Sequence, residues 1–373
     1  MKKKRHILFW SPFLGNIGTK NAVMNSAEII KKRSKNKIFL VNTFGELNDV
    51  NIKSLNILNF CNVYKFLPKT GLKSKFIIYT LCIILFPILL YNLKKNKIDV
   101  IISNLVSFLP LITKFFLKKI QIIVSIQGYP KLTFLRKLIW NILYKKSCVI
   151  ITMTDNTKKI IEKKTALKNI VHINNPIITK KIIYLSKKKL NKIDEKFFKR
   201  PVAISVGRLT KQKNFIDLIK NFDEVNKVLN YKYNLIILGD GEQKNLLKKY
   251  INENNVRQTY LLGYRKNPYN LLSNSQLFIC TSLWEDPGHA IIEAAYLKIP
   301  IITSDCPSGP KEIFKNNINC LNFNYKNQKK LKSKIFEYDL LTKKAKVKLI
   351  KNAKNSVKKF NSQNYYNEIS KFI

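Results

Sequence analysis

Short apolar runs that end at glycine or hydroxyl residues recur through the second half of this sequence and constrain its fold more than any other feature. Stretches with helical periodicity separate these runs. Strands that alternate with helices imply right-handed crossovers and a parallel sheet. Five buried strands are predicted there, at Val202–Val206, Asn234–Leu238, Thr259–Leu262, 277–281 and Ile299–Thr303, with one helix at Phe215–Leu229.

The first half of the sequence repeats the pattern. Its first strand runs into a loop that holds Gly15 and Gly18, and a helix is predicted over Asn21–Lys32. The loop is either a plain turn or a place where backbone approaches a phosphate or sugar, and its glycine spacing is not that of a Walker loop. The predicted strands are His6–Trp10, Lys37–Asn42, Asp99–Ser103, Gln121–Ile126, Val149–Thr152 and Ile170–Ile173.

The length of 373 residues exceeds one ordinary core and favours two domains. We expect an α/β protein with a doubly wound, Rossmann-like domain over residues 1–176 and a second one over residues 177–359. Residues 326–359 are predicted as lysine-rich helices. Residues 360–373 are predicted to form a final helix that packs back on the first domain.

Charge sets a second constraint, because the formal net charge is +47. Lysine dominates, with 62 Lys against 7 Arg, and it is spread evenly along the chain. Such a surface attracts phosphates, anionic lipid and nucleic acid. A nucleic-acid-binding protein is therefore the alternative function, although no basic–aromatic recognition module is present and no specific nucleic-acid partner is expected.

Cysteine and histidine usage argues against metal or disulfide chemistry. The six cysteines lack metal spacing and mostly lie in apolar runs, which indicates buried, reduced thiols in a cytosolic compartment. The three histidines do not cluster, so no metal site is predicted. The first ten residues carry only a short apolar run and are predicted to form a strand, not a signal peptide.

The segment Phe76–Leu93 is apolar enough to be considered for the membrane. A span would put strands of one sheet on opposite sides of a bilayer. Three alternatives stay open: a crossover helix whose outer face dips into the membrane, a fully buried helix, and a true span. The first is favoured, because lysines flank the segment at both ends.

Charged residues gather where the predicted strands of the second domain end. Arg208 and Lys213 follow the strand 202–206 directly, where a diphosphate could lie. A helix that begins near Gly288 would direct free N–H groups at the same anion. Glu285 and Glu293 suit hydroxyl-rich groups. Because no D-x-D pair is present, cationic side chains are expected to replace a metal ion on the diphosphate.

The second half of the chain resembles the retaining nucleotide-sugar glycosyltransferases of family 4, which have the GT-B fold of two Rossmann-like domains facing across a cleft. The matching motifs occur in order and cover nearly all of the second domain. They are SVGRLTKQKNF (205–215), LIILGDGEQ (235–243), LGYRKNPY (262–269), TSLWEDPGHAIIEAA (281–295) and SDCPSGPKEI (304–313).

The resemblance implies roles for particular residues. Arg208 and Lys213 would bind the donor diphosphate, with Gly207 in the same turn, and Glu285 would contact sugar hydroxyls as the third catalytic residue. Glu293 would bind the ribose hydroxyls. Tyr264 would border the base, and the backbone N–H groups of Gly288, His289 and Ala290 would serve the sugar or phosphate. Gly15 and Gly18 would complete the donor site from the first domain.

Two positions depart from the family pattern. Asp286 stands where many members have Gly, so the loop at Glu285 is expected to differ in shape. Gln127 lies where many relatives have a histidine near the reacting carbon, and an amide cannot act as acid or base. The side chain of His289 is either a helix-start residue or a ligand contact.

The expected function is a metal-independent, retaining hexosyl- or N-acetylhexosaminyltransferase that needs no cofactor. Its donor would be a nucleotide-diphosphate sugar, with UDP as the expected nucleotide. Its acceptor would be a lipid-linked glycan, lipopolysaccharide or another polysaccharide. The enzyme would be cytoplasmic and peripheral, on an anionic membrane surface at the inner face. A catalytically inactive relative is the third alternative, against which the intact Arg208, Lys213, Glu285 and Glu293 argue.

Overall fold

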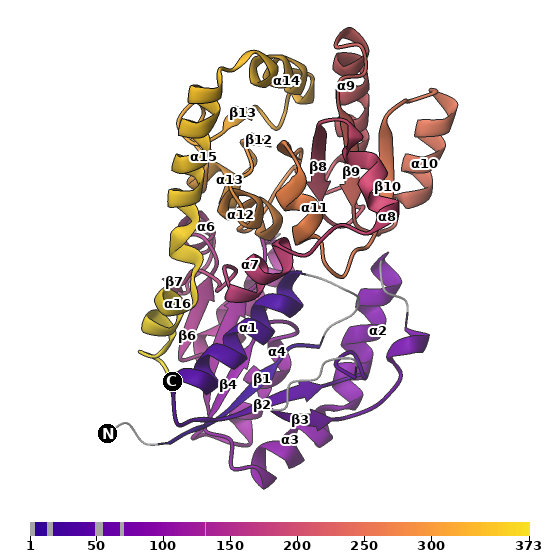
Figure 1. Cartoon of the computed structure of the whole chain (residues 1–373). Coiled ribbons are helices and arrows are strands. Elements are labelled where there is room, and N and C mark those ends of the chain that lie inside the picture. The colour runs from indigo at the N-terminus through magenta and orange to yellow at the C-terminus, as the bar shows by residue number, and fades with distance from the viewer. Residues whose placement is uncertain (1–3, 13–17, 49–54, 68–70, 131) are drawn as a thin grey trace. The chain divides into compact units, whose positions relative to one another are not determined.

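The computed structural model describes residues 4–12, 18–48, 55–67, 71–130 and 132–373, with backbone only for 71–75 (Figure 1). Gly15, one of the predicted donor contacts, lies outside the described residues. The chain divides into two compact units. Residues 1–177 and 360–373 form the first unit, and residues 178–359 form the second.

A seven-stranded parallel sheet builds the first unit, in the order β3-β2-β1-β4-β5-β6-β7. The order runs outward in both directions from the neighbours β1 and β4, which is the arrangement of a doubly wound sheet. The strands are β1 (His6–Trp10), β2 (Lys37–Asn42), β3 (Asn56–Asn59), β4 (Val100–Ser103), β5 (Gln121–Ile126), β6 (Val149–Thr152) and β7 (Ile170–His172).

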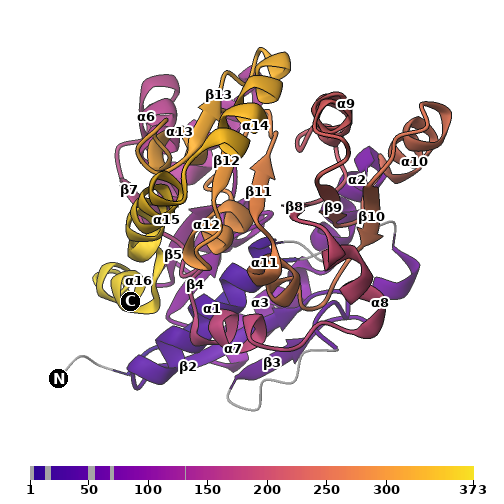
Figure 2. The same ribbon diagram turned by 45° about the horizontal axis from the view of Figure 1, so that its top comes forward.

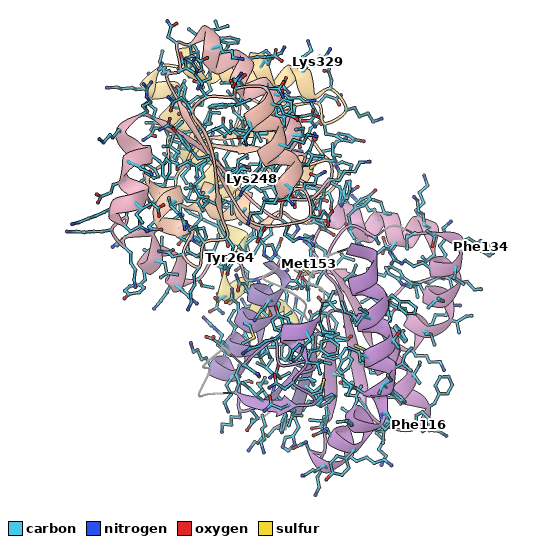
Figure 3. The ribbon with its side chains drawn as sticks, turned by 90° about the vertical axis from the view of Figure 1, so that its right-hand side faces the viewer. Phe116, Phe134, Met153, Lys248, Tyr264 and Lys329 are labelled. Atoms are coloured by element: carbon cyan, nitrogen blue, oxygen red, sulfur yellow. The ribbon has the colours of Figure 1, made fainter. Side chains whose placement is uncertain are left out.

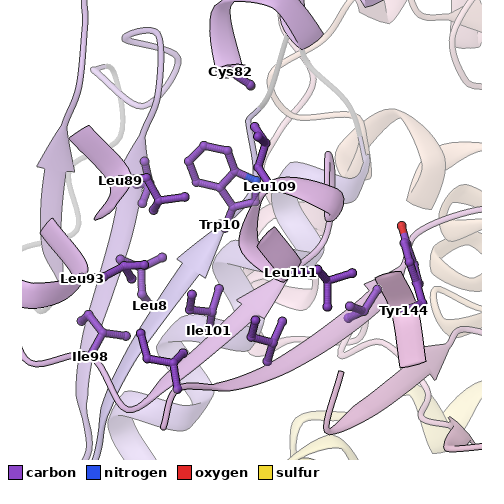
Figure 4. Packing of buried hydrophobic residues seen from close by; sticks show 14 of the residues in the cluster. Leu8, Trp10, Cys82, Leu89, Leu93, Ile98, Ile101, Leu109, Leu111 and Tyr144 are labelled. Carbon is purple, nitrogen blue, oxygen red and sulfur yellow. The ribbon is translucent and has the colours of Figure 1, made fainter. Parts of the chain in front are cut away.

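Both faces of this sheet are buried, which explains the unbroken apolar run of β1. Leu8 and Trp10 point into one cluster, with Leu89 and Leu93 of α3 (Figure 4). Ile7 and Phe9 point into the opposite cluster, which α1 and α16 cover. The helices of this unit are α1 (Gly18–Arg33), α2 (Gly71–Ile84), α3 (Phe86–Lys95), α4 (Phe108–Ile112), α5 (Phe134–Leu143), α6 (Asp155–Lys164) and α16 (Ser362–Ile369).

The segment α16 belongs to the first unit although it follows the second in sequence. Tyr365 and Ile369 are buried in the same cluster as Val23 and Ile30 of α1. The Tyr366 hydroxyl donates a hydrogen bond of 2.7 Å to the carbonyl of Arg33 at the end of α1.

The second unit repeats the design with a six-stranded parallel sheet, in the order β10-β9-β8-β11-β12-β13 (Figure 2). Its strands are β8 (Val202–Val206), β9 (Asn234–Leu238), β10 (Thr259–Gly263), β11 (Leu277–Cys280), β12 (Ile301–Ser304) and β13 (Leu321–Phe323). Its helices are α7 (Lys180–Ser186), α8 (Lys192–Glu195), α9 (Phe215–Val228), α10 (Lys244–Glu253), α11 (Tyr269–Asn274), α12 (His289–Tyr296), α13 (Gly309–Ile313), α14 (Leu331–Leu340) and α15 (Lys343–Val357).

These topologies confirm the predicted α/β class and the two doubly wound sheets. Two edge strands, β3 and β13, were not predicted, because their four and three residues are too short to show a pattern. Gly18 was predicted in the loop but is the first residue of α1. Cys148 was predicted to be buried but is exposed, whereas Cys82, Cys280, Cys306 and Cys320 are buried and free.

The apolar segment 76–93 was predicted as one helix and is two. Helices α2 and α3 meet at a bend of 50°. Pro87 lies in the first turn of α3, where its missing N–H costs nothing, and it cannot continue the hydrogen bonding of α2. Within the described residues, no single helix is long and apolar enough to cross a membrane, and the bent pair passes only as a broken span.

Candidate functional site

The predicted charged residues of the second unit lie where its sheet changes direction. Strands β8 and β11 are neighbours, and the connections that follow them lead to opposite parts of the sheet. Ligands bind at such switch points in open parallel sheets, outside the carboxyl ends of the strands. The turn 207–214 after β8 and the loop 281–288 after β11 therefore meet at this point.

A buried ion pair joins these two segments. The Lys213 ammonium donates a short hydrogen bond to Oε1 of Glu285, whose side chain is 7% exposed. The Ser282 hydroxyl donates to the same oxygen at 2.6 Å. Burial alone would lower the pKa of Lys213, but the Glu285 carboxylate outweighs it and the pKa is raised. Lys213 thus stays positively charged throughout the ordinary pH range.

The turn around Lys213 is held in place from the strand side. The Thr281 hydroxyl donates to the carbonyl of Lys213 at 2.9 Å, directly after β11. Asn214 takes a left-handed conformation, with φ of 54°, and is the N-cap residue that precedes α9. The ammonium is consequently presented by a fixed backbone and not by a flexible surface side chain.

Glycines let the backbones of the site approach one another. A side chain on Gly239 would put Cβ 1.8 Å from the carbonyl oxygen of Gly207, and the φ of Gly239 is +147°. A Cβ on Gly207 would lie 2.8 Å from Cε of Lys213. Arg208 follows as an exposed residue with no ion pair to any described residue. Its positive charge opposes the rise in the pKa of Lys213.

The loop after β11 is fixed by a second loop, after β12. The Ser304 hydroxyl donates to the carbonyl of Ser282 at 2.6 Å, and the N–H of Gly309 donates to the carbonyl of Glu285 at 3.3 Å. A Cβ on Gly309 would lie 1.8 Å from the carbonyl oxygen of Pro287, so only glycine fits there. Asp286 accepts a hydrogen bond from Ser308 at 3.2 Å, which gives this departure from the family pattern a packing role in the loop.

Helix α12 starts next to the ion pair. Gly288 precedes it in a left-handed conformation, with φ of +93°, and the helix begins at His289. Gly288 and Ala290 line one small pocket together with Lys213 and Glu285. Burial lowers the pKa of His289 to about 4, which leaves its ring neutral near pH 7. The first turn of α12, whose N–H groups have no intrahelical partners, therefore lies at the same pocket as the ion pair.

The second predicted glutamate lies further along α12. The Tyr269 hydroxyl donates to Oε1 of Glu293 at 3.1 Å. Burial raises the pKa of Glu293 to about 7, against the opposing effect of this hydrogen bond. Tyr264 is half exposed and close enough to raise the pKa of Tyr269. Tyr269 was not predicted as a site residue, although it lies inside the motif LGYRKNPY (262–269).

A brace not foreseen from the sequence holds the loop between Tyr264 and Tyr269. Arg265 forms an ion pair of 2.9 Å with Asp194, whose side chain is 4% exposed. Asn267 donates to the carbonyl of Leu185 at 3.1 Å. Helices α7 and α8, which lie at the start of the second unit, therefore fix this loop.

In the first unit, Gln127 is fully engaged by neighbouring side chains. Its amide nitrogen donates to Ser125 at 2.7 Å and to Asn104 at 3.3 Å. Its oxygen accepts from Asn175 at 3.0 Å. Asn104 in turn donates to Ser11 at 2.8 Å. This uncharged network joins residues that follow β1, β4, β5 and β7.

The described residues show no group of three or more His, Cys, Asp or Glu side chains able to hold a metal ion. Of the predicted site residues, the structure brings together Lys213, Glu285, Gly288 and Ala290, with Gly207, Arg208 and His289 beside them. Glu293, one turn into α12, is joined to Tyr269 by a hydrogen bond, and Tyr264 raises the pKa of Tyr269.

Known glycosyltransferases are similar to this chain in sequence and in structure. Residues 186–356 match the sequence model of glycosyl transferases group 1. The uncharacterized glycosyltransferase MJ1059 of Methanocaldococcus jannaschii is 43% identical over 181 residues. That match covers 47% of this chain and 44% of the relative, so the chain spans less than half of that relative's length.

Two further proteins are similar over most of the chain. A Campylobacter jejuni GalNAc-alpha-(1->4)-GalNAc-alpha-(1->3)-diNAcBac-PP-undecaprenol alpha-1,4-N-acetyl-D-galactosaminyltransferase is 24% identical, covering 75% of this chain and 76% of its own. The crystal structure of Anabaena Alr3699/HepE in complex with UDP-glucose has a TM-score of 0.76 at 16% identity and covers 98% of both chains. The fold is therefore GT-B.

Proposed function

We propose that the chain is a retaining glycosyltransferase that transfers a hexosyl or N-acetylhexosaminyl group from a nucleotide-diphosphate sugar, with UDP as the expected nucleotide. The match to glycosyl transferases group 1 supports the class of enzyme. The UDP-glucose bound in the HepE crystal structure supports the donor class, and the PP-undecaprenol glycan in the name of the Campylobacter enzyme supports the acceptor class.

The buried pair of Lys213 and Glu285 is the observation that carries this proposal. A charged pair is expensive to bury, and it is placed here at the switch point of the sheet. With Arg208 and the start of α12, Lys213 would stabilise the negative charge that grows on a departing nucleotide diphosphate. These groups would make a metal ion unnecessary.

Glu285 would act on the sugar side of the same pocket. Its Oε1 is occupied by Lys213 and Ser282, whereas Oε2 accepts no hydrogen bond within the described part of the chain. A carboxylate oxygen left in this state can accept hydrogen bonds from sugar hydroxyls. The neighbouring N–H groups of His289 and Ala290 would serve the sugar or the phosphate.

Glu293 would bind the ribose hydroxyls, and Tyr264 would border the base. The hydrogen bond from Tyr269 leaves the second oxygen of Glu293 for a vicinal diol. Gly207 would lie beside the diphosphate because it belongs to the same turn as Arg208 and Lys213, and a side chain there would collide with Cε of Lys213. Gly15 and Gly18 remain part of the proposed donor site on the basis of the family resemblance.

The acceptor would be a lipid-linked glycan, lipopolysaccharide or another polysaccharide, used at the cytoplasmic face of a membrane. Apolar side chains of the bent pair α2–α3 support a peripheral position. Ile83 is 56% exposed, Ile84 63% and Ile88 38%. A fully buried crossover helix would instead turn such residues inward.

Arg208→Ala gives the cleanest test of the donor site, because Arg208 is exposed and its loss leaves no buried charge unpaired. We expect at least a tenfold loss of UDP affinity by titration calorimetry and a loss of transfer from UDP-sugars. Lys211→Ala removes a positive charge three residues away on the same turn and serves as the control. Equal UDP binding by both variants would refute the donor-site assignment.

Two further measurements test the reaction itself. Transfer should persist in EDTA if cations of the protein replace a metal. Nuclear magnetic resonance of the first product should show the anomeric configuration of the donor, and an inverted product would overturn the retaining mechanism. Lys213→Ala and Glu285→Ala should each abolish transfer, with folding checked by circular dichroism.

A further inference from the structure

Helix α5 of the first unit shows its apolar side to solvent, which is the reverse of an ordinary surface helix. Phe134 is 84% exposed, Leu135 63%, Leu138 48% and Ile142 57%. These residues recur at the spacing of one helix face. The opposite side of α5 places Trp140 in the core of the unit, stacked on Tyr144 with ring centroids 4.8 Å apart.

This face continues onto neighbouring elements. Phe115 and Phe116, at the end of the turn η2 (Thr113–Phe115), are 62% and 61% exposed. The Phe116 ring lies 6.1 Å from that of Phe86 in α3, edge on. The Lys146 ammonium lies 3.2 Å from the Phe115 ring centroid, which ties this turn to the end of α5. Phe116 and Phe134 project from the same side of the unit (Figure 3).

The charge around this face has one sign. Between residues 76 and 154 the sequence has eleven Lys and Arg residues and a single acidic residue, Asp99. Asp99 accepts a hydrogen bond from the N–H of His6 at 2.8 Å, on the first strand. Arg136, Lys118, Lys119 and Lys145 are exposed near the apolar side chains.

We propose that α5 and the turn 115–116 form a membrane-docking surface, called here the α5 surface, that inserts shallowly into an anionic lipid bilayer. Its exposed side chains are Phe115, Phe116, Phe134, Leu135, Leu138, Ile139 and Ile142. An apolar face alone would fit any apolar partner, but a rim of lysine and arginine with almost no acid fits anionic headgroups. The purpose of this surface rests on the proposed function, whereas its existence does not.

The α5 surface adds to the membrane contact that the bent pair α2–α3 could make. The side chains Cys82, Leu89 and Leu93 of those helices belong to the core of the unit, so only the other faces of the helices can contact lipid. The α5 surface adds a second apolar element joined to the first through Phe86 and Phe116. Two apolar elements on one unit restrict its orientation on a bilayer more than one element does.

Vesicle sedimentation of the full chain tests the proposal. The triple variant Leu138→Gln, Ile139→Gln, Ile142→Gln should bind vesicles of phosphatidylglycerol and phosphatidylcholine at least tenfold more weakly than the unaltered protein. The reverse-charge pair Lys118→Glu and Lys119→Glu should weaken binding at low salt, and the unaltered protein should bind pure phosphatidylcholine poorly.

A matched control comes from the second unit. Leu246, Leu340 and Val347 are 51%, 83% and 63% exposed, and changing all three to Gln should leave vesicle binding unchanged. Equal losses in both triple variants would overturn the proposal. Self-association that the α5 variant abolishes, with no vesicle binding by the unaltered protein, would overturn it in favour of a protein interface.

Transfer to a water-soluble acceptor separates this inference from the proposed function. The α5 variant should keep that activity while losing vesicle binding. Absence of all transfer by the unaltered protein would refute the proposed function and leave the lipid result standing. Full activity without any vesicle binding would refute the α5 surface alone.

Discussion

Replacing Glu293 by glutamine should make the protein more stable at pH 8 and less able to bind the proposed nucleotide. Glu293 is half-buried, and its pKa is raised from 4.5 to about 7 by burial. In the folded protein, Glu293 therefore keeps its proton over a pH range in which it has already lost that proton in the unfolded protein. Stability is lost as the pH rises from about 4.5 through about 7, where the carboxylate must be charged in a poorly solvated site.

The size of the effect follows from the pKa of Glu293. A rise from 4.5 to about 7 corresponds to about 3 kcal/mol, since each pKa unit is worth about 1.4 kcal/mol. Glutamine keeps the shape and can still accept the hydrogen bond from Tyr269. For a unit of this size, about 3 kcal/mol moves the melting temperature by about 6–12 °C.

Calorimetric melting at pH 5 and pH 8 measures this difference. The melting temperature of Glu293→Gln should exceed that of the unaltered protein at pH 8 and come close to it at pH 5. Glu253→Gln, on the exposed face of α10, controls for the loss of one negative charge. A variant that is no more stable than this control at pH 8 would refute the burial argument. Unchanged UDP affinity would refute only the ribose assignment.

Three smaller predictions concern the scaffold. Asp194→Ala should leave Arg265 unpaired and lower the free energy of unfolding in urea by about 2 kcal/mol. Because this ion pair holds the loop beside the proposed base site, the variant should also raise the donor KM more than it lowers kcat. Gln127→Leu breaks three hydrogen bonds and should lower the urea stability by about 2–3 kcal/mol, and an unaffected midpoint would contradict the network. Gly239→Ala should prevent soluble expression, because its Cβ would lie 1.8 Å from the carbonyl oxygen of Gly207.

The sequence predicted the fold where the sheet geometry leaves a strong pattern. Strand β1 is buried on both faces, so it appears as an unbroken apolar run. The edge strand β3 shows no such run, since its residues Asn56 and Asn59 are exposed. The bend between α2 and α3 was not predicted, because the helix was inferred from the hydropathy of the whole segment and not from the position of Pro87 within it.

The candidate site was predictable as a set of residue types but not as a set of contacts. Arg208, Lys213, Glu285 and Glu293 stand in recognisable motifs. Their partners Ser282 and Tyr269 lie in the same motifs but are common residue types whose roles depend on which loops meet. Asp194, the partner of Arg265, lies outside the motifs. The pairing of Lys213 with Glu285, 72 positions apart, follows only from the adjacency of β8 and β11.

The return of α16 to the first unit has a consequence for synthesis of the chain. Tyr365, Ile369 and Ile373 are buried in the same cluster as β1, so that cluster stays open until these residues have left the ribosome. By then every strand of the second unit has been made. The second unit can therefore complete its fold first, while the first waits with an uncovered apolar face that chaperones would recognise.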